Sequence, residues 1–101
     1  MIALNGPTPD GDEVEVERWY RDVHMPELLS IPEIKSARRY KTVGGQVANG
    51  EGWPYVAIYE IETDDLQAMM AEVPNKVGPT HPQLDRTRSA LIMAIQTAGD
   101  D

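Results

Sequence analysis

The chain has 101 residues and no cysteine, and its 17 acidic against 9 basic residues give a formal net charge of −8. About 100 residues is a common size for one domain, so we expect residues 1–101 to form a single domain. The negative charge disfavours nucleic acid as a partner, because proteins that bind it present basic patches. Without cysteine there is no disulfide, no thiolate nucleophile and no sulfur ligand for a metal.

The sequence indicates neither a membrane span nor a secretion signal. No apolar run approaches the roughly 20 residues that cross a bilayer, and Met1 to Leu4 lack the basic start of a signal peptide. We therefore expect a cytoplasmic protein with no membrane partner. A chain this short buries only about two thirds of its unfolded surface, so a second copy would add to its core. We expect a homodimer.

A strand and an amphipathic helix are predicted first. Residues 1–5 are apolar and precede a turn-rich segment, which predicts a strand. Asp12 and Glu15 fit a capping box at the start of a helix. One face of that helix carries apolar side chains at the i, i+3, i+4, i+7 spacing: Val16, Trp19, Tyr20 and Val23. On the opposite face, Glu17 and Arg21 have the spacing of a favourable ion pair.

A proline and a polar strand follow this helix. Pro26 should break or kink the helix and start a fresh turn, because proline lacks the backbone donor that a helix interior needs. Residues 34–43 then alternate as a strand with polar groups on both faces. Arg38 and Tyr40 share one face of this strand, whereas Arg39 takes the other. If Arg38 points into a pocket, Arg39 points toward the helices or the sheet edge.

The next segments predict a hairpin and a second helix. Residues 44–52 are rich in glycine and connect to a third strand over residues 54–61. Asp64 and Gln67 fit another cap, and the helix should stop by Pro74. Its apolar positions again have helical spacing: Leu66, Met69, Met70 and Val73.

The chain should end in a long connection and a last strand. Residues 75–88 show no apolar period, and connections of that length tend to be functional or mobile. Residues 89–97 are apolar on both faces and predict the last strand. The resulting order, βαββαβ, is that of the split βαβ arrangement, an α+β fold with both helices on one face of a four-stranded antiparallel sheet. The other face, with apolar and aromatic groups on the last two strands, is left bare for a partner surface.

The run WYRDVHMPELLSIPEIKSARRY resembles the signature of the EthD-like group within the dimeric α+β barrel superfamily. The resemblance covers about a quarter of the chain and rests on a Trp-Tyr pair, a histidine, a proline and an Ala-Arg-Arg-Tyr run: Trp19, Tyr20, His24, Pro26 and residues 37–40. It implies a ferredoxin-like fold and a homodimer with face-to-face sheets, each subunit holding a pocket between its sheet and first helix. The superfamily includes muconolactone-type isomerases, polyketide cyclases and cofactor-free or haem-degrading monooxygenases, so it fixes the fold more tightly than the chemistry.

His24, Arg38 and Tyr40 are the candidate catalytic residues. An imidazole has an ordinary pKa of about 6.5, so His24 could take or give a proton near neutrality. Arg38 could hold a carboxylate or enolate while Tyr40 donates to a carbonyl oxygen. The alternative is that His24 caps the broken helix end by donating to a carbonyl and that Arg38 and Arg39 pair with surface acids.

Four further residues are candidates for the substrate pocket. Tyr20 lies one helical turn before His24, and Tyr59, like Tyr40, combines apolar area with a hydroxyl that needs a partner. Trp53 could cover a pocket mouth or pack on the partner subunit. His81 could act as a lid residue, although a solvated loop histidine is the favoured interpretation. Nothing in the spacing of the histidines indicates a metal site.

We therefore expect a homodimer that binds a small aromatic, lactone or polyketide-like molecule and catalyses an isomerisation or cyclisation by proton transfer, without a cofactor. The alternatives are a non-catalytic small-molecule binding or accessory protein and a cofactor-free monooxygenase in which Trp53 and Tyr59 matter more.

Overall fold

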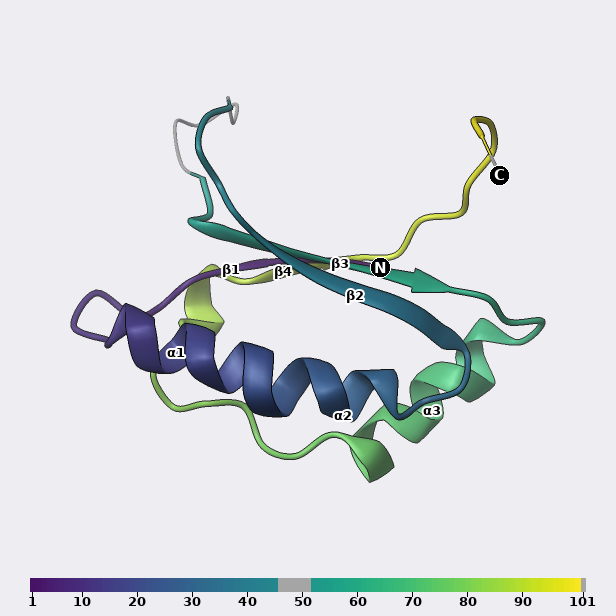
Figure 1. Ribbon diagram of the computed structural model, residues 1–101, viewed down its shortest axis with the longest axis horizontal. Coiled ribbons are helices and arrows are strands. Elements are labelled where there is room, and N and C mark those ends of the chain that lie inside the picture. Colours follow the sequence, from purple (N-terminus) through teal and green to yellow (C-terminus); the bar gives the residue numbers. More distant parts are fainter. Residues whose placement is uncertain (46–51, 101) are drawn as a thin grey trace.

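The protein is a four-stranded antiparallel sheet with helices packed on one of its faces (Figure 1). The computed structural model describes residues 1–45 and 52–100. The elements in chain order are β1 (Ile2–Asn5), α1 (Glu13–Trp19), the π-helical turn η1 (Tyr20–His24), α2 (Met25–Leu29), β2 (Ile34–Lys41), β3 (Tyr55–Ile61), α3 (Leu66–Lys76), the 3-10 turn η2 (Arg86–Arg88) and β4 (Ala90–Ile92). The strand order is β2-β3-β1-β4. The predicted α+β fold and its βαββαβ order are confirmed.

The last strand is much shorter than predicted. Residues 89–97 were expected to form it, but β4 covers only Ala90–Ile92. Its only partner is β1, whose first residue, Ile2, lies opposite Ile92. The ladder therefore stops where β1 begins, and the remaining chain leaves the sheet (Figure 1).

The ends of the helices differ from the prediction in two further places. The second helix, α3, is capped by Asp65, which accepts from the Ala68 amide at 3.0 Å, rather than by Asp64. It then continues past Pro74 to Lys76. The predicted hairpin over residues 44–52 lies mostly outside the described residues.

The first helix begins as predicted and does not break at Pro26. Asp12 caps it, accepting from the Val14 amide at 3.0 Å and the Glu15 amide at 3.2 Å. The Asp12 amide donates to Gln83 Oε1 at 3.0 Å, so the reciprocal half of the predicted capping box is not made by Glu15. At the proline, the wide turn η1 leads directly into α2, with Pro26 in its first turn, where a missing N–H costs little.

The π-helical turn decides which side chains reach the core. Val16 and Leu28 are twelve residues apart, about three and one third turns of a regular α-helix, which would place them on different faces. One extra residue in η1 restores the alignment, so Val16, Tyr20 and Leu28 are all buried. Val23, predicted to pack with them, is instead 44% exposed.

The pairing register assigns each strand residue to one face of the sheet. Ala57 lies opposite both Ala3 and Arg39, and it is fully buried beneath the helices. Arg39 therefore faces the helices. Arg38, opposite Ile58, lies on the open face. The β3 tyrosines that were expected on the open face also point toward the helices, where Tyr59 is 2% exposed.

The connection after α3 is tied to the rest of the molecule. It passes across the helices on its way to β4 (Figure 1). The Gly78 amide donates to Glu27 Oε2 at 2.9 Å, the Thr8 amide donates to the Gln83 carbonyl at 2.8 Å, and the Asp85 amide donates to the Gly6 carbonyl at 2.9 Å. These bonds fix the segment that forms one wall of the candidate site. Within the described ranges, no helix is long and apolar enough to cross a membrane.

Candidate functional site

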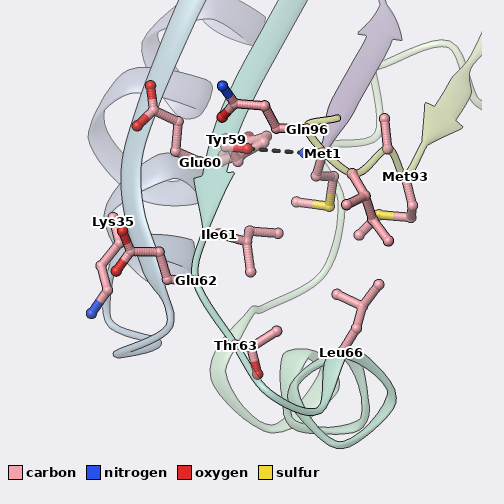
Figure 2. A pocket seen from close by; sticks show the side chains of 12 residues that line it. Met1, Lys35, Tyr59, Glu60, Ile61, Glu62, Thr63, Leu66, Met93 and Gln96 are labelled. Carbon is pink, nitrogen blue, oxygen red and sulfur yellow. Dashed lines mark hydrogen bonds between the residues drawn. The ribbon is translucent and has the colours of Figure 1, made fainter. Parts of the chain in front are cut away.

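Two of the cavities in the described part of the chain open at opposite ends of the sheet. The larger one, of about 530 Å³, lies between the end of β3, the start of α3 and the chain after β4 (Figure 2). The terminal ammonium of Met1 donates to the Tyr59 carbonyl at 2.9 Å at its wall. Its charged lining residues are Lys35, Glu60 and Glu62. No histidine is among its lining residues, so it has no side chain whose ordinary pKa suits proton transfer near neutral pH.

The smaller cavity, of about 330 Å³, is bounded by β1, β4, η1 and the connection after α3, and we call it the His24 cavity. Its polar lining residues are Asn5, Tyr20, His24, Thr80, Arg86 and Ser89. Its apolar lining residues are Ala3, Leu84, Ala90 and Leu91. A hollow that combines apolar surface with convergent polar groups is a usual form of a small-molecule site.

Asn5 and Tyr20 form the buried polar wall of the His24 cavity. Asn5 Nδ2 donates to the Tyr20 hydroxyl oxygen at 3.1 Å, and both residues are almost fully buried. Because Tyr20 accepts this bond, its own hydroxyl proton stays available for donation. Asn5 Oδ1 is buried and has no hydrogen-bond partner among the described residues.

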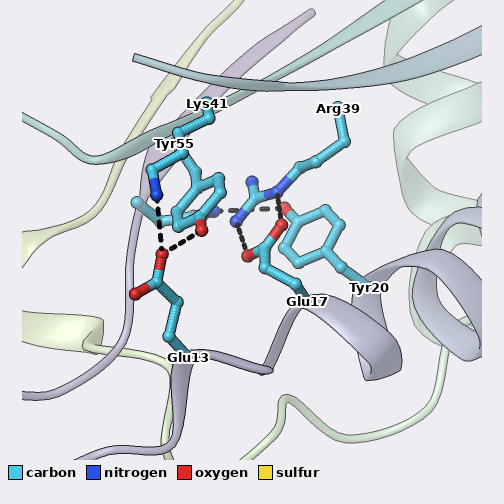
Figure 3. Close-up of polar contacts among 7 residues, drawn as sticks. Glu13, Glu17, Tyr20, Arg39, Lys41 and Tyr55 are labelled. Atoms are coloured by element: carbon cyan, nitrogen blue, oxygen red, sulfur yellow. Dashed lines mark hydrogen bonds and ion pairs between the residues drawn. The ribbon is translucent and has the colours of Figure 1, made fainter. Parts of the chain in front are cut away.

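Arg39, which is not a lining residue, packs its guanidinium on the Tyr20 ring (Figure 3). Its guanidinium lies 3.7 Å from the centre of the Tyr20 ring and 4.9 Å from that of Tyr55. It also donates to Glu17, at 2.9 Å to Oε1 and 2.8 Å to Oε2. This forked pair replaces the predicted Glu17 to Arg21 pair. Planar, two-point contacts of this kind fix geometry as well as charge.

A second polar contact closes the same end of the helix against the sheet (Figure 3). The Tyr55 hydroxyl donates to Glu13, and Lys41 Nζ lies 3.4 Å from the same carboxylate. Burial, reinforced by the bond to Glu13, raises the pKa of Tyr55 to about 12. The bond from Tyr55, together with the Lys41 charge, lowers the pKa of Glu13. These residues fasten α1 to β2 and β3 and are not among those lining the His24 cavity.

His24 lies in the cavity wall with its ring held by two aromatic neighbours. It stacks on Trp19, with ring centres 4.6 Å apart and planes 20° apart, and meets Tyr20 edge to face at 4.8 Å. Burial lowers the pKa of His24 below 6.5; the Glu27 charge opposes this effect and the Arg39 charge adds to it. The imidazole is therefore neutral at pH 7 and able to accept a proton.

The structure does not show the capping role that was the alternative for His24. Its Nδ1 is buried and has no hydrogen-bond partner among the described residues, and no cap bond from its side chain is present at the start of α2.

Arg38 and Tyr40 are not brought together with His24. Both lie on the open face of the sheet, where Arg38 is 3.5 Å from Glu60 and Tyr40 is 47% exposed. The sheet separates them from the His24 cavity. The pairing of Arg38 with a surface acid agrees with the alternative weighed for it from the sequence.

The other predicted pocket residues are also spread out. Tyr59 faces the helices and lines the larger cavity. Its hydroxyl has no hydrogen-bond partner among the described residues, and burial raises the pKa of Tyr59 above its ordinary value. Trp53 is not among the residues that line either cavity. His81 accepts from the Gln83 amide at 3.0 Å and meets Trp19 edge to face, behind the His24 cavity rather than in its lining.

The sequence reasoning missed Asn5 and Arg86 as lining residues and Arg39 as the residue that packs on Tyr20. A signal existed for Arg39, because it shares a strand face with Ala37, and a small residue suits a strand face covered by helices. Asn5 ends a short apolar strand, and Arg86 lies in a segment without a period, so neither carries a local signal. Among the described residues, no group of three or more His, Asp or Glu side chains could hold a metal.

Comparisons with known proteins return no match: no family model, no curated protein and no solved structure matches this chain. The structure itself defines a small α+β protein of ferredoxin-like type, with a four-stranded antiparallel sheet and helices on one face.

Proposed function

We propose that the chain is a cofactor-independent isomerase or cyclase that moves a proton on a small aromatic, lactone or polyketide-like molecule bound in the His24 cavity. The observation that carries the proposal is a histidine with a lowered pKa in a cavity wall shared with two buried polar side chains, Asn5 and Tyr20. The EthD-like resemblance supports it, because that group is expected to hold its pocket between the sheet and the first helix.

In the proposed reaction, neutral His24 removes a proton from a carbon next to a carbonyl group. The electron pair of the broken C–H bond moves to the carbonyl oxygen, which becomes an enolate. Tyr20 donates its free hydroxyl proton as a hydrogen bond to that oxygen, while Asn5 holds the tyrosine oxygen from the other side. The imidazolium of His24 then returns the proton to another atom of the substrate. Tyr20 thus takes the role that the sequence suggested for Tyr40.

Exchange of carbon-bound hydrogen for deuterium tests this proposal without knowledge of the natural substrate. The protein is incubated in D₂O with an aryl ketone or an unsaturated γ-lactone, and the loss of the proton signal next to the carbonyl is followed by NMR. We expect the protein to accelerate exchange of at least one compound and His24→Gln to slow it by about 10² to 10⁴-fold, the usual contribution of general base catalysis.

His81→Gln is the matched control, because it replaces the other histidine, which lies outside the cavity lining. It should leave the exchange rate unchanged. Equal rates in the folded His24→Gln variant and the original protein would refute the role of His24, as would the absence of protein-dependent exchange for every compound.

A binding protein without catalysis is the second candidate function. The observation that favours it is the position of Arg38 and Tyr40 across the sheet, which leaves the cavity without the cationic and phenolic pair expected from the sequence. Ligand-induced thermal stabilisation with no deuterium exchange would select this function. The monooxygenase alternative gains no such observation, because Trp53 and Tyr59 do not line a common cavity among those described.

We also propose that the protein is a homodimer formed through the open face of the sheet. This face presents Ile58 and Ile92, 40% and 45% exposed, next to the half-exposed ring of Tyr40. Apolar side chains gathered on one sheet face are typical of an association surface. A face-to-face arrangement leaves the His24 cavity, on the helix side, within each subunit.

A further inference from the structure

The charge of the His24 cavity is opposite in sign to that of the whole chain. The chain has 17 acidic and 9 basic residues, yet the cavity lining contains one cationic side chain, Arg86, and no carboxylate. His24, the other titratable base in the lining, is held neutral by burial. Arg86 is therefore the charged side chain that this lining presents to a ligand.

Arg86 lies in a turn whose backbone is fixed by its neighbour Asp85. The Asp85 carboxylate accepts from the Thr87 amide at 3.0 Å and from the Thr87 hydroxyl at 2.6 Å, so it caps η2. The Asp85 amide donates to the Gly6 carbonyl at 2.9 Å, which fixes the turn to the end of β1. Arg86 is the first residue of that turn, and its side chain is exposed.

The guanidinium of Arg86 has no ion-pair partner among the described residues, although five other basic side chains do: Arg18, Arg21, Arg38, Arg39 and Lys41. The carboxylate nearest to it in sequence, Asp85, is engaged by Thr87. A cation at a cavity wall with no acid in the same lining is available to a negatively charged ligand.

The other lining residues indicate the chemistry of the rest of that ligand. Leu84 and Leu91 give the wall an apolar surface, and Thr80 adds one hydroxyl. Ser89 donates its hydroxyl proton to the Asp85 carbonyl at 2.6 Å, so it is not a free donor. One guanidinium matches one carboxylate in charge and in two-point geometry, whereas a phosphate dianion would keep one charge unbalanced beside apolar groups.

We propose that the ligand of the His24 cavity is a monocarboxylate with an apolar body, whose carboxylate pairs with Arg86 while its body lies against Leu84 and Leu91. This inference rests on the proposed function in taking the His24 cavity as the ligand site.

Binding of matched acid and amide pairs tests the inference. Benzoate is compared with benzamide, and cinnamate with cinnamamide, by titration followed in amide ¹H–¹⁵N NMR spectra of the full chain. We expect each carboxylate to bind about tenfold or more tightly than its amide, the usual scale of a charge-assisted pair. Arg86→Gln should abolish this preference, and Arg86→Lys should retain part of it because it keeps the charge.

Arg88→Gln is the matched control, since Arg88 lies in the same turn but donates to the Gly52 carbonyl at 3.0 Å and is not in the cavity lining. It should keep the preference for carboxylates. Equal binding of acids and amides, no binding of either acid, or an equal loss in Arg88→Gln would each overturn the inference.

The outcomes separate this inference from the proposed function. Deuterium exchange that depends on His24, with no preference for carboxylates, would overturn the inference alone. Carboxylate binding that depends on Arg86, with no exchange, would support the inference and refute the proposed enzyme.

Discussion

Two buried polar atoms without partners belong to residues that line the His24 cavity, Asn5 Oδ1 and His24 Nδ1. The other three among the described residues are Ser36 Oγ, Arg39 Nη1 and the Tyr59 hydroxyl oxygen. Leaving such an atom unpaired costs about 1 to 3 kcal/mol, so folded proteins keep few of them. The two atoms beside the cavity are therefore a cost that the fold bears at its candidate site.

The lowered pKa of His24 has a consequence for stability. Because burial favours the neutral ring in the folded state, the unfolded chain binds more protons as the pH falls through 6.5, the ordinary value of a histidine. Protons therefore stabilise the unfolded chain, and the free energy of unfolding should fall between about pH 7.5 and pH 5.5. His24→Gln removes this contribution, so its stability should change less over the same interval.

Urea unfolding at the two pH values, followed by circular dichroism, measures this difference. His81→Gln serves as the control for the loss of a histidine as such. A His24→Gln variant that loses as much stability on acidification as the original protein would contradict the assignment of a depressed pKa to His24.

At the residue scale, the sequence predicted Tyr20 and His24 as neighbours one turn apart, and the structure confirms that they meet in one cavity wall. It chose Arg38 over Arg39 as the arginine of the site, whereas the structure places Arg38 on the open face and Arg39 beside Tyr20. The strand β2 carries polar groups on both faces, so its alternation alone does not show which face is covered. The answer comes from pairing with β3, where Ala57 is opposite Arg39, and a single strand contains no information about its partner's register.

At the element scale, the helix before β2 shows how a chain passes a proline without a break. Pro26 predicted a break or kink followed by a fresh turn; the fresh turn is present as α2, with Pro26 in its first turn, but the wide turn η1 leads into it and the helical path continues. π-helical turns inside helices are often found at functional sites, because they move side chains out of the regular α-helical order. Here the turn leaves Val23 outside, 44% exposed, a result that helical spacing alone does not predict.

The connection after α3 gives a prediction at this scale. Glu27 on α2 accepts from the Gly78 amide, and this bond helps to hold the segment that carries the Thr80 and Arg86 walls of the cavity. Glu27→Ala should release it, and the Gly78 amide should then exchange with solvent about fivefold to tenfold faster, as expected for the loss of one exposed, charge-assisted bond.

Native-state hydrogen exchange by NMR reads this rate directly. Glu27→Gln keeps an acceptor oxygen and should retain most of the protection. Equal exchange of Gly78 in the original protein and in Glu27→Ala would show that the segment is held by its other bonds.

At the scale of the whole molecule, the order of elements followed from the sequence because turn residues and apolar periods are local signals. The length of β4 did not, since it is set by where β1 begins. The segment after Ile92 is apolar on both faces in the sequence, yet Ile95 is 86% exposed in the single chain. Apolar residues on this segment and on the open face of the sheet are therefore not buried by the chain's own fold.

The proposed homodimer predicts how this surface behaves. The double substitution Ile58→Glu and Ile92→Glu would place two negative charges of each subunit in the interface. The original protein should have twice the mass of one chain, and the double variant should have the mass of a single chain. Leu29→Glu is the control, because Leu29 is similarly exposed, at 43%, but lies on α2, away from the open face. Light scattering coupled to size-exclusion chromatography measures the masses. Because the His24 cavity lies on the helix side of the sheet, the separated chains should keep the carboxylate preference set by Arg86; a single-chain mass for the original protein would refute the dimer and leave that site untouched.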